Sequence, residues 1–282
     1  MTKRILSAAV GLALLAVILL YYNTIIFNIA ISAISFLATF EILHATKFFD
    51  KKTLSIVCLL FAMLVPFLTL LDFRQSYTPF ILSFILILFI LLLRYHSRIK
   101  IEQVGLAFMV STLIPLSLTT MIFLRDMAAA NGRFVLLLAL AGAWIGDTGA
   151  YFVGTFLGKH KLCPTISPKK TVEGFIGGIV ATSVSFVIMG YIYTLYKASG
   201  GVEIQVNYVL LFVLGIICDL LGVMGDLSAS IIKRQYEIKD FGNIMPGHGG
   251  VLDRFDSVLF VVPFMYMVFL IMNETQMFYL IK

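Results

Sequence analysis

The segment from Gly225 to Asp256 holds most of the side chains in this sequence that could do chemistry. It reads GDLSASIIKRQYEIKDFGNIMPGHGGVLDRFD and combines carboxylates, cations and a glycine-flanked histidine. Carboxylate oxygens suit hard divalent cations, and the candidates for such a metal site are Asp226, Asp253 and, more weakly, Asp256. The cations that could clamp phosphate groups, arginine bidentately, are Lys233, Arg234, Lys239 and Arg254.

A second polar segment, Ser167-Pro168-Lys169-Lys170-Thr171, stands directly before a glycine-rich stretch at Gly174, Gly177 and Gly178. The free N–H groups and the dipole of a helix N-terminus bind phosphate, especially beside cations. The hydroxyls of Ser167 and Thr171 could donate to phosphate oxygens. The alternative is that these glycines serve close packing between membrane helices, and the sequence leaves both interpretations open.

The histidine of the first segment, His248, lies in Pro-Gly-His-Gly-Gly and has no His or Cys neighbour at zinc spacing. We therefore expect it to donate to a phosphate oxygen or to orient the loop. An ordinary surface histidine is the alternative. Two basic segments together with oxygen-rich metal ligands indicate phosphate chemistry.

The rest of the chain is hydrophobic enough to lie within a lipid bilayer. Its 282 residues are 60% hydrophobic and 13% charged, with a mean hydropathy of +1.01. Soluble domains are about one quarter charged, so the composition indicates a membrane protein. The net charge of +6 does not point to nucleic acid, because the basic residues are scattered between apolar segments. The three cysteines are widely spaced and form no CxxC pattern, so they indicate neither a disulfide framework nor a zinc site.

Apolar runs long enough to cross a bilayer predict an all-α, polytopic membrane protein with about nine transmembrane helices. The fourth run is short, so that helix could be less tilted or begin before Pro79. The expected spans are 5–22, 24–46, 53–71, 79–93, 103–124, 133–157, 171–196, 208–231 and 257–273.

With nine spans, most Lys and Arg residues fall on the same side as the N-terminus, which the positive-inside rule places in the cytoplasm. We expect a single membrane domain over residues 1–282. Within it, 1–130 carries few motifs and 140–260 forms a catalytic core with cytoplasmic loops at 158–171 and 232–256.

Five carboxylates fall within or at the edges of these spans: Glu41, Asp147, Glu173, Asp219 and Asp226. A charge at mid-bilayer costs a few kcal/mol, so such residues usually face a polar cavity. Asp219 and Asp226 share one helix face. Asp147 and Glu173 could order the neighbouring cations or help to bind metal. The alternative for each acid is a capped or paired structural residue.

Residues 230–256 resemble the signature of the phosphatidate cytidylyltransferase family, the CDP-diacylglycerol synthases. The family pattern runs S-x-x-K-R, four residues, K-D, then P-x-H-G-G-x-x-D-R-x-D. Met245 precedes Pro246 where the family usually has another apolar residue. The matching residues are Ser230, Lys233, Arg234, Lys239, Asp240, Pro246, His248, Gly249, Gly250, Asp253, Arg254 and Asp256. Also similar are Asp147-x-x-Ala150-Tyr151, the Ser167–Gly174 segment, Asp219 and Gly225-Asp226.

The resemblance implies a nucleotidyltransferase of phospholipid biosynthesis, which transfers CMP from CTP to phosphatidate and releases pyrophosphate. The expected catalytic residues are Asp226, Lys233, Arg234, Lys239, Asp240, His248 and Asp253. Those expected to bind substrate or phosphate are Ser167, Lys169, Lys170, Thr171, Glu173, Gly249, Gly250 and Arg254. Those expected to hold metal are Asp226 and Asp253, with Asp256 and Asp147 as weaker candidates.

The resemblance also implies magnesium dependence, leaves a second cation open and fits a homodimer. CTP, phosphatidate and membrane lipids are the expected partners, at the cell inner (cytoplasmic) membrane with the active site facing the cytoplasm. One alternative is a CTP-dependent kinase of an isoprenoid alcohol. Another is an ion-coupled transporter, which an odd span count and the absence of a visible inverted repeat disfavour.

Overall fold

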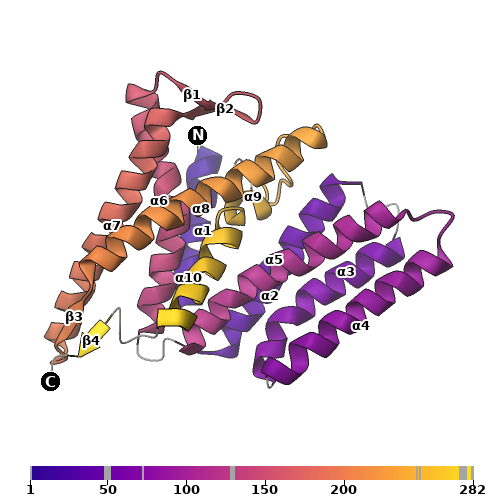
Figure 1. Cartoon of the computed structure of the whole chain (residues 1–282), viewed down its shortest axis with the longest axis horizontal. Coiled ribbons are helices and arrows are strands. Elements are labelled where there is room, and N and C mark those ends of the chain that lie inside the picture. The colour runs from indigo at the N-terminus through magenta and orange to yellow at the C-terminus, as the bar shows by residue number, and fades with distance from the viewer. Residues whose placement is uncertain are drawn as a thin grey trace. The chain divides into compact units, whose positions relative to one another are not determined.

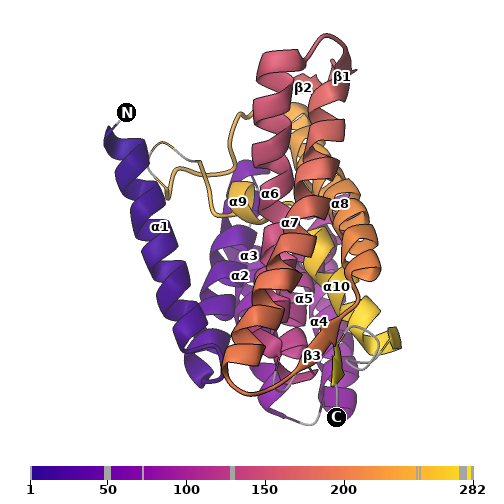
Figure 2. The same cartoon turned by 90° about the vertical axis from the view of Figure 1, so that its left-hand side faces the viewer.

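Long apolar α-helices make up most of the molecule (Figures 1 and 2). The computed structural model describes residues 2–47, 52–71, 73–127, 131–245, 247, 249–272 and 278–280. In this described part, eight helices are long and apolar enough to cross a membrane, and a shorter apolar helix, Ala9–Leu20, precedes them. The predicted all-α fold with about nine apolar helices is confirmed. The cytoplasmic placement of the N-terminus stays a prediction.

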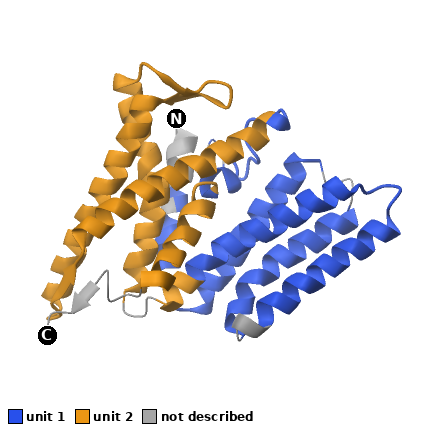
Figure 3. Ribbon diagram, viewed as in Figure 1, with its two compact units in different colours: residues 1–122, 235–255 blue, residues 123–234, 256–282 orange. Residues whose placement is uncertain are grey.

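The chain forms two compact units, coloured separately in Figure 3. Unit 1 comprises residues 1–122 and 235–255, and unit 2 comprises residues 123–234 and 256–282. Residues 235–255, called the signature segment from here on, therefore belong to the same unit as the N-terminal helices. The signature residues Ser230, Lys233, Arg234 and Asp256 belong to unit 2, which precedes and follows this segment in sequence. The expectation of one continuous membrane domain stays a prediction.

Unit 1 is a bundle in which α2 packs against α3 and η2, and α3 packs against α4. Pro66 has no N–H to donate to an α-helical ladder, and at this point α3 gives way to the 3₁₀ helix η2. Asn28 of α2 donates to the Pro66 carbonyl at 3.2 Å and to Thr69 Oγ1 at 2.8 Å. The helices are α1 (Thr2–Leu20), α2 (Ile25–Ala45), α3 (Lys52–Leu64), η2 (Val65–Leu70), α4 (Phe73–Arg94), α5 (Ile101–Met127, which continues into unit 2) and α9 (Leu252–Phe255). Helix α4 thus begins before Pro79, one of the two options left open by the sequence.

Unit 2 is built on the contact between α6 and α7, which run side by side in both views (Figures 1 and 2). Glycines allow this approach, because a Cβ at Gly149 would overlap Ala181 and a Cβ at Gly177 would overlap Val153. The packing role that the sequence left open for the glycine-rich stretch therefore holds at Gly177. The helices are α6 (Gly132–Leu157), α7 (Val172–Ser199), α8 (Tyr208–Gln235) and α10 (Val258–Met272).

Two short two-stranded antiparallel sheets, which the sequence did not predict, also belong to unit 2. Strands β1 (Lys161–Cys163) and β2 (Ser167–Thr171) pair within the segment expected to be a loop at 158–171. They are joined by a β-turn in which the Ile166 N–H donates to the Cys163 carbonyl at 3.2 Å. Pro164 is its second residue, where the fixed φ of proline suits the turn. Strands β3 (Ile204–Val206) and β4 (Phe278–Leu280) form the other sheet, which pairs two segments that are far apart in the sequence.

Candidate active site

An ion pair between Lys170 and Asp226 joins the first hairpin to helix α8. The ammonium Nζ of Lys170 lies 2.5 Å from Asp226 Oδ2. Their side chains are 22% and 24% exposed, so water screens the attraction only in part. The sequence assigned phosphate binding to Lys170 and metal binding to Asp226, and the structure places the two groups in direct contact.

Two further carboxylates act on this pair within unit 2. Asp256 is buried, and it interacts electrostatically with Asp226, with Lys233 and with Asp147 of α6. Its Oδ1 accepts from the Ser257 N–H at 2.8 Å. The chain here lies so close to α8 that a Cβ at Gly225 would overlap the Asp256 carbonyl. Gly225 and Asp226 therefore have separate roles. The glycine lets the backbone at Asp256 pack closely against α8, and the aspartate supplies a carboxylate next to it.

Asp219 lies two turns before Asp226 on α8 and is almost completely buried, at 2% exposure. Thr182 of α7 donates to its Oδ1 at 3.1 Å, and its Oδ2 has no hydrogen-bond partner among the described residues. A Cβ at Gly146 would overlap the carboxylate. Asp219 of α8 thus packs against both α6 and α7, and neither contact could be predicted from the sequence.

Three predicted phosphate-site residues shape the hairpin in this structure. Glu173 accepts from the Lys159 N–H at 3.0 Å and from His160 Nδ1 at 2.6 Å, which ties the end of α6 to the start of α7. Thr171 caps α7 by accepting from the Gly174 N–H at 3.2 Å. Arg234 Nε donates to the Ile166 carbonyl at 3.2 Å and so holds the turn of the hairpin against α8.

A cavity of about 450 Å³ opens in unit 2 between α6, α7 and this hairpin. Its cationic members are Lys161, Lys169 and Lys170, and Asp147 adds one carboxylate. Tyr151, Phe175 and Val223 give it an apolar wall. It thus joins positive charge to an apolar surface, as a phosphate attached to a lipid would require. Lys161, Phe175 and Val223 were not singled out from the sequence, because only the fold brings them to one place with Tyr151.

The signature segment in unit 1 is organised by Asp253. Its Oδ2 accepts from the N–H groups of Phe241 and Gly250, both at 2.9 Å. Gly249 has a φ of +85°, which glycine adopts without strain, and its carbonyl accepts from the Met245 N–H at 3.1 Å. Asp253, predicted to bind metal, therefore also folds the segment that carries it. Pro246 and His248 lie outside the described residues, so the role of His248 stays a prediction.

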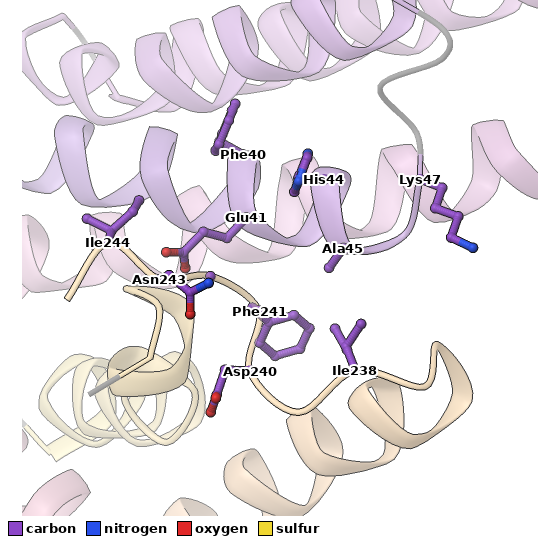
Figure 4. Close-up of a pocket in the computed structure, with 11 residues that line it drawn as sticks. Phe40, Glu41, His44, Ala45, Lys47, Ile238, Asp240, Phe241, Asn243 and Ile244 are labelled. Carbon is purple, nitrogen blue, oxygen red and sulfur yellow. The ribbon is translucent and has the colours of Figure 1, made fainter. Parts of the chain in front are cut away.

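A second cavity, of about 680 Å³, lies in unit 1 where the end of α2 meets residues 238–244 (Figure 4). Its lining includes Phe40, His44 and Phe241 as well as the carboxylates of Glu41 and Asp240. In Figure 4 the Glu41 side chain reaches from α2 towards the segment that carries Asn243.

The predicted site residues are divided between the two units, and the structure describes each group by itself. The side chains of Lys169, Lys239, Asp240 and Arg254 are exposed, as phosphate-binding groups at a water-facing site need to be. Unit 2 holds Asp147, Ser167, Lys169, Lys170, Thr171, Glu173, Asp226, Lys233, Arg234 and Asp256. Unit 1 holds Lys239, Asp240, Gly249, Gly250, Asp253 and Arg254.

The donor set of unit 2 fits a magnesium ion that shares its coordination with a substrate. Mg²⁺ usually takes one or two protein carboxylates together with water and phosphate oxygens. Asp226 and Asp256, which interact electrostatically, supply such oxygens, and Asp147 in turn interacts with Asp256. In the part of the chain that the structure describes, no three His, Cys, Asp or Glu side chains could hold an ion by themselves.

Comparison with known proteins extends the similarity over nearly the whole chain. A model of the cytidylyltransferase family matches residues 2–272. The phosphatidate cytidylyltransferase of Bacillus subtilis (strain 168) is 36% identical over 276 residues, which cover 94% of this chain and 96% of that protein. Those of Staphylococcus haemolyticus (strain JCSC1435) and Staphylococcus aureus (strain COL) are each 44% identical over 134 residues, 48% of either chain.

Proposed function

Because the chain belongs to the cytidylyltransferase family, we propose that it is a phosphatidate cytidylyltransferase. It would transfer CMP from CTP to phosphatidate and yield CDP-diacylglycerol and pyrophosphate. The observation that carries the proposal is the cavity of unit 2, where Lys161, Lys169 and Lys170 meet an apolar wall. A phosphate monoester on a lipid has the same two parts, a charged head and an apolar tail.

The reaction needs no protein nucleophile. A phosphate oxygen of phosphatidate already carries negative charge and attacks the α-phosphorus of CTP. A P–O bond forms there while the bond between the α-phosphorus and the bridging oxygen breaks, and pyrophosphate leaves with that electron pair. The protein has to hold two polyanions together and to stabilise the charge that grows on the leaving group.

Lys170 and its neighbour Lys169 are placed to offset the repulsion between the two substrates. Lys170 is held by Asp226, so its ammonium is already in position when a phosphate oxygen approaches. Lys233 and Arg234 occupy the last turn of α8, and Lys239 and Arg254 belong to the signature segment. We assign these four cations to the phosphates of CTP, with His248 as a further donor.

Asp226 and Asp253 would hold Mg²⁺, with Asp256 and Asp147 as further candidates. When bound, the ion would neutralise charge on the CTP phosphates and on the departing pyrophosphate. Asp226 is paired with Lys170, so in the complex Asp226 would bind the metal ion while Lys170 would bind a phosphate oxygen. A second cation beside magnesium remains part of the proposal.

The setting of the enzyme follows from the same proposal. Its apolar helices would span the cytoplasmic membrane several times, with the active site on the cytoplasmic side where CTP is present. Large apolar side chains are exposed along the helices of unit 2, among them Ile188, Ile192 and Leu195 of α7. Such side chains would contact lipid or a second copy of the chain in a homodimer.

Product analysis of the purified chain in detergent micelles tests the activity. With radiolabelled CTP, phosphatidate and Mg²⁺, we expect a labelled CDP-lipid and stoichiometric pyrophosphate. In a parallel reaction, an isoprenoid alcohol replaces phosphatidate. A phosphorylated alcohol with free CDP, formed while phosphatidate stays unchanged, would overturn the proposal in favour of a kinase.

Matched variants connect that activity to the site. Asp226→Asn should lower the rate of CDP-lipid formation by about 10²- to 10³-fold, because it removes a metal ligand and the partner of Lys170. Asp126→Asn is the control, since Asp126 is half-exposed and pairs with its neighbour Arg125 at the end of α5. Full turnover by a folded Asp226→Asn protein at ordinary magnesium concentrations would contradict the metal assignment.

A further inference from the structure

We propose that Glu41, on helix α2, is a positioning residue for the reaction, because it holds the backbone of the signature segment directly before Asp253. This inference rests on the proposed cytidylyltransferase function. It gives a role in the reaction to the N-terminal half of the chain, in which the sequence showed no motif. Every contact that supports it lies within unit 1.

The contact is a two-point grip on consecutive peptide groups. Glu41 Oε1 accepts from the Val251 N–H at 2.9 Å, and Oε2 accepts from the Leu252 N–H at 2.8 Å. Both bonds are buried and join residues more than 200 positions apart in the chain. Since each oxygen takes one N–H, the carboxylate fixes both the position and the orientation of this short stretch.

Asp253 grips the same stretch from its other end. Its Oδ2 accepts from the Gly250 N–H, so three successive N–H groups, at 250, 251 and 252, are shared between two carboxylates. Displacement of the Val251–Leu252 backbone would therefore move the Asp253 side chain as well. Glu41 and Asp253 also interact electrostatically as like charges, and the peptide N–H groups between them offset this repulsion.

Two glycines show how closely the segment is drawn to Glu41. A Cβ at Gly250 would overlap the carboxylate, and so would a Cβ at Gly242. Gly250 belongs to the signature, whereas Gly242 does not. The segment thus reaches Glu41 through two positions without side chains, and a side chain at either position would push the grip open.

The carboxylate form of the residue matters for this role. A charged oxygen makes a stronger hydrogen bond to a peptide N–H than a neutral one does. Glutamine offers one oxygen and one NH₂ group, so one of the two peptide N–H groups would face another donor. Residues that orient a metal ligand typically change metal affinity or activity by about 10- to 100-fold when they are mutated.

The first test compares Glu41→Gln with the native protein in full-length, purified form. We expect turnover to fall by about 10- to 100-fold and the magnesium concentration for half-maximal activity to rise by about 10-fold. Gly242→Ala should shift both quantities in the same direction, because it disturbs the grip from the side of the segment. Unchanged magnesium dependence in a folded, active Glu41→Gln protein would overturn the inference.

The matched control is Asn28→Leu on the same helix. Asn28 is buried and ties α2 to η2 through Pro66 and Thr69, so its loss weakens α2 without touching residues 250–253. We expect this variant to unfold at a lower temperature and to keep native magnesium dependence per folded molecule. A magnesium shift as large as that of Glu41→Gln would show that general loosening of α2 is sufficient, and would also overturn the inference.

Hydrogen–deuterium exchange on the native protein gives a readout that requires neither activity nor a folded variant. The amides of Val251 and Leu252 should exchange slowly, whereas those at Asn243 and Ile244, which are exposed, should exchange fast. Fast exchange at 251 and 252 would refute the grip even if Glu41→Gln fails to fold. If the native protein makes no CDP-lipid, the proposed function fails. If it does and Glu41→Gln behaves as native, only this inference fails.

Discussion

The Lys170 ammonium and the Asp226 carboxylate form an ion pair of 2.5 Å between strand β2 and helix α8. The two residues are 56 positions apart in the sequence and were assigned to different ligands, one to phosphate and one to metal. Their contact means that the hairpin and α8 form one chemical unit. The charge state of either residue therefore bears on the position of the other.

Exchanging Lys170 and Asp226 tests whether their ion pair is needed for catalysis or only for the structure of unit 2. Each single variant, Lys170→Met and Asp226→Asn, should lower kcat/KM by about 10² to 10³, the usual cost of losing one electrostatic contact to a transition state. The double variant Lys170→Asp/Asp226→Lys restores an ion pair but reverses both ligand-binding charges, so it should stay inactive. Recovery of activity in CDP-lipid assays of the double variant would show that the pair serves structure alone.

Glu173→Gln should weaken the anchor of the first hairpin. The carboxylate accepts from Lys159 and His160, and its loss would let the strand that carries Lys169 and Lys170 shift. Misplacement by about 1 Å can cost up to about 100-fold in rate, so kcat/KM should fall although Glu173 need not touch substrate. Initial-rate kinetics measure this, with Glu203→Gln, an exposed acid beside β3, as the control. Equal kinetics of the two variants would argue against the anchor.

Gly146→Ala should destabilise unit 2, because the new methyl group would overlap the buried Asp219 carboxylate. Overpacking of this kind costs about 1–3 kcal/mol. Gly105→Ala in α5 is the matched substitution, since a Cβ there meets nothing within 4 Å and alanine favours the helix by up to about 1 kcal/mol. Thermal unfolding in detergent should rank Gly146→Ala clearly below both the native protein and Gly105→Ala.

Tyr193→Phe should reduce stability and leave the activity per folded molecule unchanged. The Tyr193 hydroxyl donates to Asn131 Oδ1 at 2.5 Å, and its ring stacks on Phe134 with centroids 4.1 Å apart. Phenylalanine keeps the stacking and loses the hydrogen bond, which is worth about 0.5–1.5 kcal/mol. The exposed Tyr191 provides the control variant, Tyr191→Phe. A stability equal to that of the control would mean that the hydrogen bond contributes nothing.

Hydropathy and local motifs were sufficient to predict the helical part of the fold. A segment that crosses a bilayer needs a long apolar run, and its backbone groups must hydrogen-bond within the helix. Such a run can be recognised from the local sequence alone. Hydropathy did not fix where α4 begins. The helix starts before Pro79, but the polar residues ahead of the proline interrupt the apolar run from which a span is recognised. The signature segment was likewise visible because its residues are close together in sequence.

The contacts between distant segments could not be predicted. Nothing local to Glu41 says that its partners are the peptide groups of Val251 and Leu252, since backbone N–H groups carry no sequence signal. The first hairpin was missed for a related reason. Its strands are very short and lie in a polar, lysine-rich stretch, whereas the usual strand signal is a run of β-branched and aromatic residues.

The interleaving of the two units limits how this enzyme can be divided. A fragment of residues 123–282 would keep every motif that the sequence displays, but it would lose α2 and with it the acceptor for Val251 and Leu252. Conversely, residues 1–122 transplanted from a relative would have to bring a glutamate to the same place on α2. The unremarkable N-terminal helices and the signature segment are therefore expected to be exchangeable between relatives only as a matched set.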